Sequence, residues 1–240
     1  MRYLARVSYD GSKFHGFQRL NDGSGVQNEI ERVLKKLFHR EIEIKGAGRT
    51  DAGVHALDQC FHFDLDVDIS LDKLQYALNK HLSRYIYVHS IDCVSSLFHA
   101  RYDVKEKTYL YKIYIGEKNP FIVDYACAIS KKMDLKKMIE CSKLFVGEHN
   151  YKNFVSGERD NYNSVVHNVI IRKEDDYIFL EFIGHSFYRY MVRSMVGAIV
   201  QVGLGNVLIL DVEMALNHPE ITKTFLVAPP EGLYLTNISY

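Results

Sequence analysis

The sequence of 240 residues has no tryptophan, few prolines and no net charge, and the last two features each argue against a class of protein. Thirty basic and thirty acidic residues cancel, which argues against a protein that coats nucleic acid through bulk charge, although a local basic groove is still allowed. Only four prolines and fifteen glycines argue against a disordered or collagen-like chain. With 47% hydrophobic residues, the chain is long enough to bury one large core or two small ones.

The sequence also lacks paired cysteines and long apolar runs. Its four cysteines form no C-x-x-C pair, which predicts reduced, buried thiols in a cytoplasmic protein and argues against a zinc site. No apolar run reaches the roughly 20 residues that span a bilayer. The first residues have the alternation of a strand, so no signal peptide is expected.

Strand and helix patterns follow one another in two successive halves. Alternating residues predict a strand at 2–9, and helical spacing predicts a helix at 26–38 with Ser24 as its cap. Further strands are expected at 42–45, 56–65, 85–94, 107–115, 165–172, 177–184 and 233–240, and further helices at 71–82, 135–145 (capped by Asp134), 187–202 and 211–217. The predicted fold class is α+β, with two lobes at 1–104 and 105–240, each a largely antiparallel sheet with helices on one face.

The stretch 46–55 is too rich in small residues to form a regular element. Its three glycines and two alanines surround Arg49, Thr50 and Asp51, and glycine permits tight turns and close approach of a ligand. A phosphate-binding loop would need a spaced G-K-[ST], which is missing. The stretch therefore presents either a reactive carboxylate beside a guanidinium or a structural turn in which Asp51 caps or pairs with Arg49.

The run Gly-Ala-Gly-Arg-Thr-Asp-Ala-Gly-Val-His-Ala at 46–56 resembles the signature of the TruA-type tRNA pseudouridine synthases. Four more parts of the sequence resemble that family in the same order: 9–18, 98–101 followed by 107–111, 191–197, and 228–235. Matches in the right order over nearly the whole chain argue against a chance likeness.

The resemblance implies an enzyme that isomerises uridine to pseudouridine in the anticodon stem-loop of tRNA, at positions 38–40, as a homodimer without cofactor or metal. Asp51 matches the essential aspartate, the catalytic nucleophile, and Arg193 the basic residue that pairs with it. Tyr109 matches the tyrosine that packs against the target base, and Arg49 the arginine that handles the flipped nucleotide. We expect His99, Arg101 and Arg189 to line or flank a central RNA-binding cleft between the lobes.

Elementary chemistry agrees with these roles. The reaction breaks the C1′–N1 glycosidic bond and rejoins the base through C5, so it needs no redox change, hydrolysis or energy input. Taking the base out of the stack costs a few kcal/mol, and an aromatic face such as Tyr109 returns about 1–3 kcal/mol. Burial disfavours an ionised Asp51, and a guanidinium from Arg193 opposes that effect.

Several alternatives stay open. Tyr109 is equally suited to a strand core, and Arg193 to the surface of a helix. A metal-assisted hydrolase built on Asp51 and His55, or a non-catalytic RNA-binding protein, would use the same residue types, although the spacing of His55 and His62 suits no common metal-ligand pair. The lysines between 131 and 137 form either a solvated face or a phosphate-contacting patch. The segment 186–190 is unexpectedly rich in aromatic residues, a departure from the family that bears on how tRNA docks.

Overall fold

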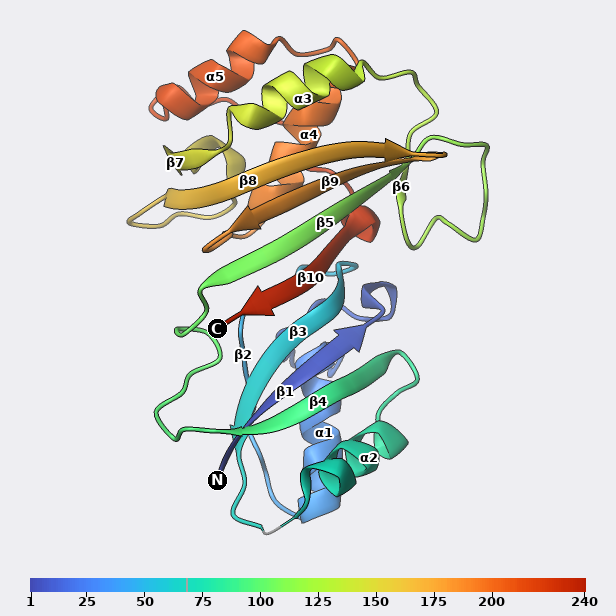
Figure 1. The fold of residues 1–240 in the computed structure, drawn as a ribbon, viewed down its shortest axis with the longest axis vertical. Helices are drawn as coiled ribbons and strands as arrows, with labels where there is room; N and C mark the ends of the chain where they lie inside the picture. The colour runs from blue at the N-terminus through green and yellow to red at the C-terminus, as the bar shows by residue number, and fades with distance from the viewer. Residues whose placement is uncertain (68) are drawn as a thin grey trace. The chain divides into compact units, whose positions relative to one another are not determined.

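The computed structural model describes residues 1–67 and 69–240, which form two compact units. Unit 1 contains Met1–Lys105 together with Tyr234–Tyr240, and unit 2 contains Glu106–Leu233. The predicted α+β class is confirmed, because both units combine a mainly antiparallel sheet with helices (Figure 1). The sequence placed one boundary between 104 and 105, whereas in the structure the C-terminal strand returns to unit 1.

Unit 1 is built around a sheet with the strand order β4-β1-β3-β10. Its elements are β1 (Arg2–Tyr9), α1 (Val26–Phe38), β2 (Lys45–Gly46), β3 (His55–Asp64), α2 (Leu71–His81), β4 (Ile86–Val94) and β10 (Leu233–Ser239). β1 runs antiparallel to both β3 and β4, whereas β10 is parallel to β3. The register pairs Arg2 with Asp64 and Tyr9 with Ala56, so the two ends of β3 face the two ends of β1.

Alternating residues of β1 and β3 form the apolar core of unit 1. Tyr3 and Phe63 are paired in the register and their rings stack 5.5 Å apart. α1 buries Ile30, Val33 and Leu34 at helical spacing. Its N-cap is Gly25 rather than the expected Ser24, because Asn28 reaches back and its Oδ1 accepts the Gly25 N–H at 3.2 Å. This bond marks the helix start and is only one half of a capping box, because Gly25 has no side chain to form the other half.

α2 lies along the outer side of β4, the last strand of the unit 1 sheet. Asn79 Oδ1 accepts the N–H of Val88 at 2.8 Å, and Asn79 Nδ2 donates to the Val88 carbonyl at 2.9 Å. Gln75 Nε2 donates to the carbonyls of Val88 and His89. Two side-chain amides thus hold the helix to the strand.

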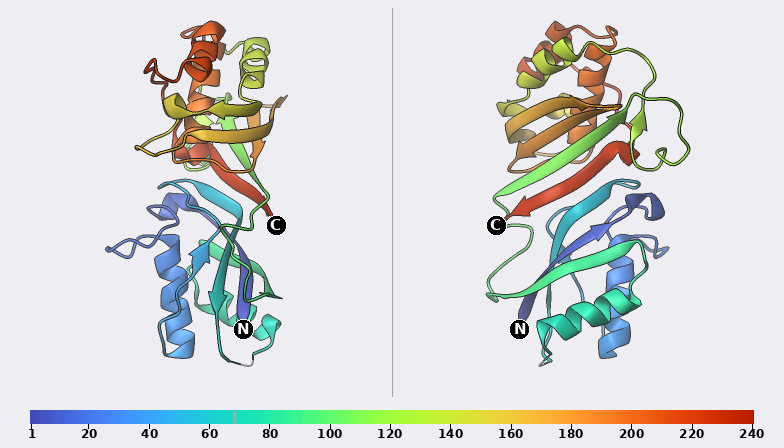
Figure 2. Two further views of the ribbon diagram at one scale, coloured as in Figure 1. Left: turned by 90° about the vertical axis from the view of Figure 1, so that its left-hand side faces the viewer. Right: turned by 45° about the vertical axis from the view of Figure 1, so that its right-hand side comes forward.

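The strands of unit 2 follow the order β5-β9-β8-β7, and each neighbouring pair in this order is antiparallel. Its elements are β5 (Glu106–Tyr114), β6 (Cys127–Ala128), α3 (Leu135–Lys143), β7 (Gly147–Asn150), β8 (Asn163–Glu174), β9 (Tyr177–Gly184), α4 (Met191–Gly203) and α5 (Ile209–Asn217). Short 3₁₀ turns lie at Gly11–Lys13 in unit 1 and at Lys152–Phe154 and Pro230–Gly232 in unit 2. α3 packs against α4 and β8, as Figure 2 also shows. The expected cap at Asp134 is confirmed, since its carboxylate accepts the N–H groups of Lys136 and Lys137.

The long helix of unit 2 starts later than the sequence suggests. Helical spacing predicted a helix from 187 to 202, but α4 begins at Met191 because Tyr190 has φ +66°. A left-handed residue cannot continue a right-handed helix, and for a bulky side chain this conformation is strained. The segment 186–190 is therefore a loop, and its aromatic residues do not form the buried face of a helix.

The described cysteines carry free thiols. Cys60, Cys127 and Cys141 are buried, as expected, whereas Cys93 is exposed on β4. Burial raises the pKa of the Cys141 thiol to about 12, which keeps it protonated and inert. Throughout the described ranges, no helix is both long and apolar enough to cross a membrane.

Candidate active site

The glycine-rich loop that carries Asp51 is held by the opening segment of unit 1. The N–H of Phe17 donates to the Thr50 carbonyl at 3.2 Å, and the N–H of Gly53 donates to the Phe14 carbonyl at 3.4 Å. Beneath them, the hydroxyls of Tyr9 and Thr50 are 2.8 Å apart in a buried hydrogen bond. Burial raises the pKa of Tyr9 to about 12, so its hydroxyl keeps its proton. Residues on both sides of Asp51 are thus fixed.

Two glycines of the opening segment allow this close approach. A Cβ on Gly11 would lie 2.0 Å from the Val54 carbonyl oxygen, far inside van der Waals contact. A Cβ on Gly16 would lie 2.7 Å from the Thr50 carbonyl oxygen, and Gly16 also has φ +97°. Only glycine is compatible with the backbone at these two positions.

Asp51 itself is half-buried, and its carbonyl accepts the N–H of Val54 at 3.1 Å, which closes a tight turn. Arg49 is exposed, and its side chain makes no hydrogen bond or ion pair with any described residue. The structural-turn alternative, in which Arg49 pairs with Asp51, is therefore not what the structure shows. The loop presents a carboxylate and an uncommitted guanidinium two residues apart.

His55 is a structural residue. It is 2% exposed, its Nδ1 accepts the Gly11 N–H at 3.1 Å, and its ring stacks 4.6 Å from that of Tyr234. Its Nδ1 also lies 3.4 Å from the carboxylate of Asp10. A ring nitrogen that already binds a backbone amide is a poor metal ligand, which weakens the hydrolase alternative. Within 1–67 and 69–240, no three His, Cys, Asp or Glu side chains form a possible metal site.

In unit 2, Tyr109 lies on β5 and is only 8% exposed. Its ring meets that of Phe187 edge to face at 5.3 Å. Two residues further along the strand, the buried Tyr111 donates its hydroxyl to the Pro229 carbonyl at 2.8 Å. β5 therefore offers two tyrosines in succession on the same face, and Tyr111 is tied to the segment that follows α5.

Arg193 lies in the first turn of α4, where the same C-terminal segment of unit 2 holds it. Its Nε donates to the Ala228 carbonyl at 2.7 Å, and the Ala228 N–H donates back to the Arg193 carbonyl at 3.0 Å. Gly197 permits this packing, because a Cβ there would lie 1.6 Å from the Leu226 carbonyl oxygen. The guanidinium carbon also lies 4.9 Å from the centre of the Tyr190 ring. Arg193 is thus an anchored, half-buried cation rather than a mobile surface residue.

His99 and Arg101 lie at the opposite end of β3 from Asp51. The N–H of Ala100 donates to Nδ1 of His62 at 3.1 Å, and His62 lies seven residues along the strand from His55. At the usual rise of a strand, this is roughly 20 Å. The structure therefore does not bring His99 and Arg101 next to Asp51, whereas Arg49 lies on the same loop.

Sequence reasoning missed the residues that support the loop. Tyr9, Gly16 and Phe17 belong to the segment 9–18, which the family resemblance singled out, but their contacts with residues 46–55 depend on folding. Tyr190 was missed because its left-handed backbone is invisible in a helical pattern. The lysines at 131, 132, 136 and 137 are all exposed to solvent.

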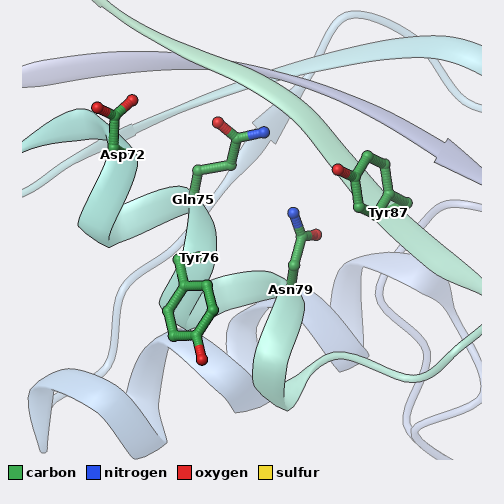
Figure 3. A pocket seen from close by; sticks show the side chains of 5 residues that line it. All are labelled: Asp72, Gln75, Tyr76, Asn79 and Tyr87. Carbon is green, nitrogen blue, oxygen red and sulfur yellow. The ribbon is translucent and has the colours of Figure 1, made fainter.

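A surface hollow of about 360 Å³ lies elsewhere in unit 1, against α2 and β4 (Figure 3). It is lined by Asp72, Gln75, Tyr76, Asn79 and Tyr87. Gln75 and Asn79 already bind the backbone of β4, and none of the residues predicted for the active site lines the hollow. We therefore assign the hollow no role in catalysis.

Comparison with known proteins shows the family of the chain. Residues 5–103 and 141–240 match the family model described as tRNA pseudouridine synthase. The tRNA pseudouridine synthase A of Pseudothermotoga lettingae is 38% identical over 243 residues, which cover 100% of this chain and 99% of the relative. The tRNA pseudouridine synthase A 2 of Bacillus anthracis is 36% identical over 242 residues, with 99% of each chain covered.

Among solved structures, an H/ACA RNP bound to a substrate RNA containing 2′-deoxyuridine is similar with a TM-score of 0.39 and 13% identity, covering 82% of this chain and 44% of that one. A Cbf5–Nop10–Gar1 complex is similar with a TM-score of 0.36 and 13% identity, covering 83% and 54%. Scores this low carry no argument. The family match and the full-length relatives do, and they show that this chain belongs to the TruA-type family of tRNA pseudouridine synthases, which are isomerases.

Proposed function

We propose that this chain converts uridine to pseudouridine in the anticodon stem-loop of tRNA, at positions 38–40, with Asp51 as the catalytic nucleophile. The observation that carries the proposal is the anchoring of the Asp51 loop by the buried Tyr9–Thr50 hydrogen bond and the close approach of Gly16. A carboxylate held in this way is positioned before the substrate arrives, which is how enzymes lower the entropic cost of reaction.

The reaction is an isomerisation in which atoms balance without a co-reactant. The C1′–N1 bond breaks, the base turns, and C5 bonds to C1′; the proton on C5 is released, and N1 gains a proton. Attack by Asp51 on the nucleoside would form a covalent intermediate that divides this rearrangement into two easier steps. Label at C5 is therefore lost to water once per turnover.

The other predicted residues take supporting parts in this proposal. Tyr109 packs against the extruded base, and Arg193 pairs with Asp51 and keeps it anionic. Arg49, exposed and uncommitted, contacts the flipped nucleotide or its phosphate. His99 and Arg101 contact a part of the tRNA remote from the target, since they lie at the other end of β3. The homodimer implied by the family resemblance and the cytoplasmic location predicted from the cysteines belong to the same proposal.

A tritium-release assay on tRNA labelled at uridine C5 tests the chemistry. We expect release by the wild type without added metal, and none above background by Asp51→Asn. Asp72→Asn, which changes an aspartate on α2, is the matched control and should keep full activity. Equal release by wild type and Asp51→Asn would disprove the nucleophile. Loss of activity with a chelator would favour the hydrolase, and tRNA binding without release would favour a non-catalytic RNA-binding protein.

Mapping the modified uridines tests the target. tRNA from cells that lack this protein should lose pseudouridine at positions 38–40 and keep it elsewhere. Loss at other positions would leave the chemistry intact but contradict the proposed specificity.

A further inference from the structure

Within unit 2, the aromatic-rich loop 186–190 forms part of a group of stacked arginines and tyrosines. The guanidinium carbon of Arg159 lies 4.2 Å from the centre of the Tyr188 ring. Arg189 and Arg193 both lie 4.9 Å from the centre of the Tyr190 ring. We call Arg159, Tyr188, Arg189 and Tyr190 the arginine–tyrosine cluster.

The cluster is held in place by hydrogen bonds between two loops. The N–H of Ser156 donates to the Arg189 carbonyl at 3.1 Å, and the Tyr188 hydroxyl donates to the Asn163 carbonyl at 2.6 Å. The N–H of Arg159 donates to the Tyr162 hydroxyl at 3.3 Å. The rings are therefore fixed supports on which the guanidinium groups rest.

The positive charges of this cluster are not compensated. Among the described residues, neither Arg159 nor Arg189 has a carboxylate within ion-pair distance, even though Glu158 and Asp160 flank Arg159 in the sequence. An anion such as a phosphate group would compensate the charges of Arg159 and Arg189.

Hydrogen bonding leaves the same cluster with donors to spare. The Arg159 side chain has one hydrogen bond in the described part of the chain, a long one of 3.4 Å from its Nη2 to the Ser156 carbonyl. Its Nε is buried and has no partner, so a phosphate would meet the Nη groups. Arg189 makes a single marginal contact of 3.5 Å with the Tyr190 hydroxyl. A guanidinium whose face rests on a ring keeps its N–H edge in the plane, the geometry that binds two phosphate oxygens at once.

Tyr190 adds a second, independent sign that this loop is specialised. Its φ of +66° costs free energy for a bulky side chain, and such strain persists only where the surrounding structure imposes it. Asparagine or glycine would adopt this conformation more easily. The ring that lies against both Arg189 and Arg193 therefore stands at a position where the backbone conformation does not favour tyrosine.

We propose that the arginine–tyrosine cluster is a binding site for the phosphodiester backbone of RNA, in which Arg159 and Arg189 each hold a phosphate. This inference rests on the proposed function, because the tRNA substrate supplies the phosphates. The site binds without reading sequence, since phosphate contacts fix the register of the RNA and carry no base information.

The test is tRNA affinity measured against salt concentration with an unmodified tRNA transcript. Arg159→Gln and Arg189→Gln should each weaken binding by about threefold to tenfold and lower the salt slope by about one counterion. Arg172→Gln is the matched control: Arg172 also rests on a ring, Phe179 at 4.8 Å, but its charge is paired with Glu174. It should bind as the wild type does.

The conservative changes Arg159→Lys and Arg189→Lys keep the positive charge. They therefore show whether weaker binding by the Arg→Gln variants comes from the lost charge or from a disturbed fold. They should keep the salt slope of the wild type and lose only part of the affinity, while thermal melting checks that each variant is folded. Unchanged affinity and slope in folded Arg→Gln variants would overturn the phosphate site. If wild type releases tritium in the same experiment, the proposed function survives that result. If the Arg→Gln variants lose affinity but wild type releases no tritium, the phosphate site stands and the proposed function fails.

Discussion

The two ends of β3 use the same device for different purposes. At one end His55 accepts the backbone N–H of Gly11, and at the other end His62 accepts that of Ala100, both through Nδ1 at 3.1 Å. The first contact fixes the opening segment beneath Asp51, and the second fixes the loop that carries His99 and Arg101. In each case a buried histidine connects a strand to a loop. The loop at one end carries Asp51, and the loop at the other end carries His99 and Arg101.

The largest effect should come from disturbing the Asp51 end. Gly16→Ala places a Cβ 2.7 Å from the Thr50 carbonyl oxygen and pushes the catalytic loop, so we expect kcat to fall by about 100-fold, as misplacement by 1 Å can do. Gly23→Ala is the matched control, because Gly23 also has positive φ (+79°) but has open space around it. Tritium-release kinetics should show kcat within about twofold of wild type for Gly23→Ala. Equal losses would mean that backbone strain, not the contact with Thr50, is responsible.

A second, smaller effect should distinguish the two ends of β3, because changes at one end should alter kcat and changes at the other should alter KM. Arg49→Gln removes a cation beside Asp51 and should lower kcat by about tenfold. Arg101→Gln, at the other end of β3, should raise KM about threefold and leave kcat unchanged, since it removes a phosphate contact. Arg40→Gln, on the surface of unit 1, serves as the control. A fall in kcat for Arg101→Gln would show that the two ends act on the same part of the substrate.

The residues behind these kinetic differences could be predicted from the sequence, but their positions relative to one another in the fold could not. The family resemblance gave roles to Asp51 and Arg49, and the expected RNA-binding cleft added His99 and Arg101. Their spacing along the chain gave no sign that β3 separates them. The distance follows from the strand register, which pairs Tyr9 with Ala56 and Arg2 with Asp64. Long-range pairing of this kind is set by packing across the whole sheet, not by any local pattern.

Local chemistry was easier to predict from the sequence. The strand bounds at 2–9 and 177–184 and the cap at Asp134 follow from alternation and capping preference, and the structure confirms them. The predicted start of α4 was wrong, because helical periodicity gives no information about the left-handed backbone of Tyr190. The roles of His55 and His62 were equally hidden, since each binds the backbone of a residue 38 or more positions away.

A third prediction concerns the buried hydrogen bond beneath Asp51. Tyr9→Phe removes the hydroxyl that meets Thr50 and should lower the free energy of unfolding by about 1 kcal/mol in urea denaturation. Tyr102→Phe removes a hydroxyl from a side chain that is 76% exposed at the other end of β3. It should change stability by less than about 0.5 kcal/mol. A larger loss for Tyr102→Phe would reveal an unexpected role for that hydroxyl.

The smallest effect should be a pH dependence specific to the His62 end. Burial, and then the charges of Arg2 and His99, lower the pKa of His62 to about 4 from the usual 6.5, with Asp64 opposing the shift. Between pH 6.5 and 4 the unfolded chain binds a proton that the folded chain excludes, so the free energy of unfolding falls as pH falls.

His62→Asn offers an amide oxygen in place of Nδ1 and cannot titrate. Urea unfolding at about pH 6.5 and about pH 4.5 should therefore show a weaker decline for His62→Asn than for wild type. Identical declines would mean that His62 does not contribute, and that other groups cause the acid sensitivity.

The pairing of α2 with β4 has a consequence for how molecules of this protein meet one another. A terminal strand with bare amide and carbonyl groups is a template for strands from other chains, and this is a common route to aggregation. Here Asn79 and Gln75 occupy those groups at Val88 and His89. The helix therefore blocks the edge of β4 at these two residues, so that a strand of another molecule cannot pair with it there.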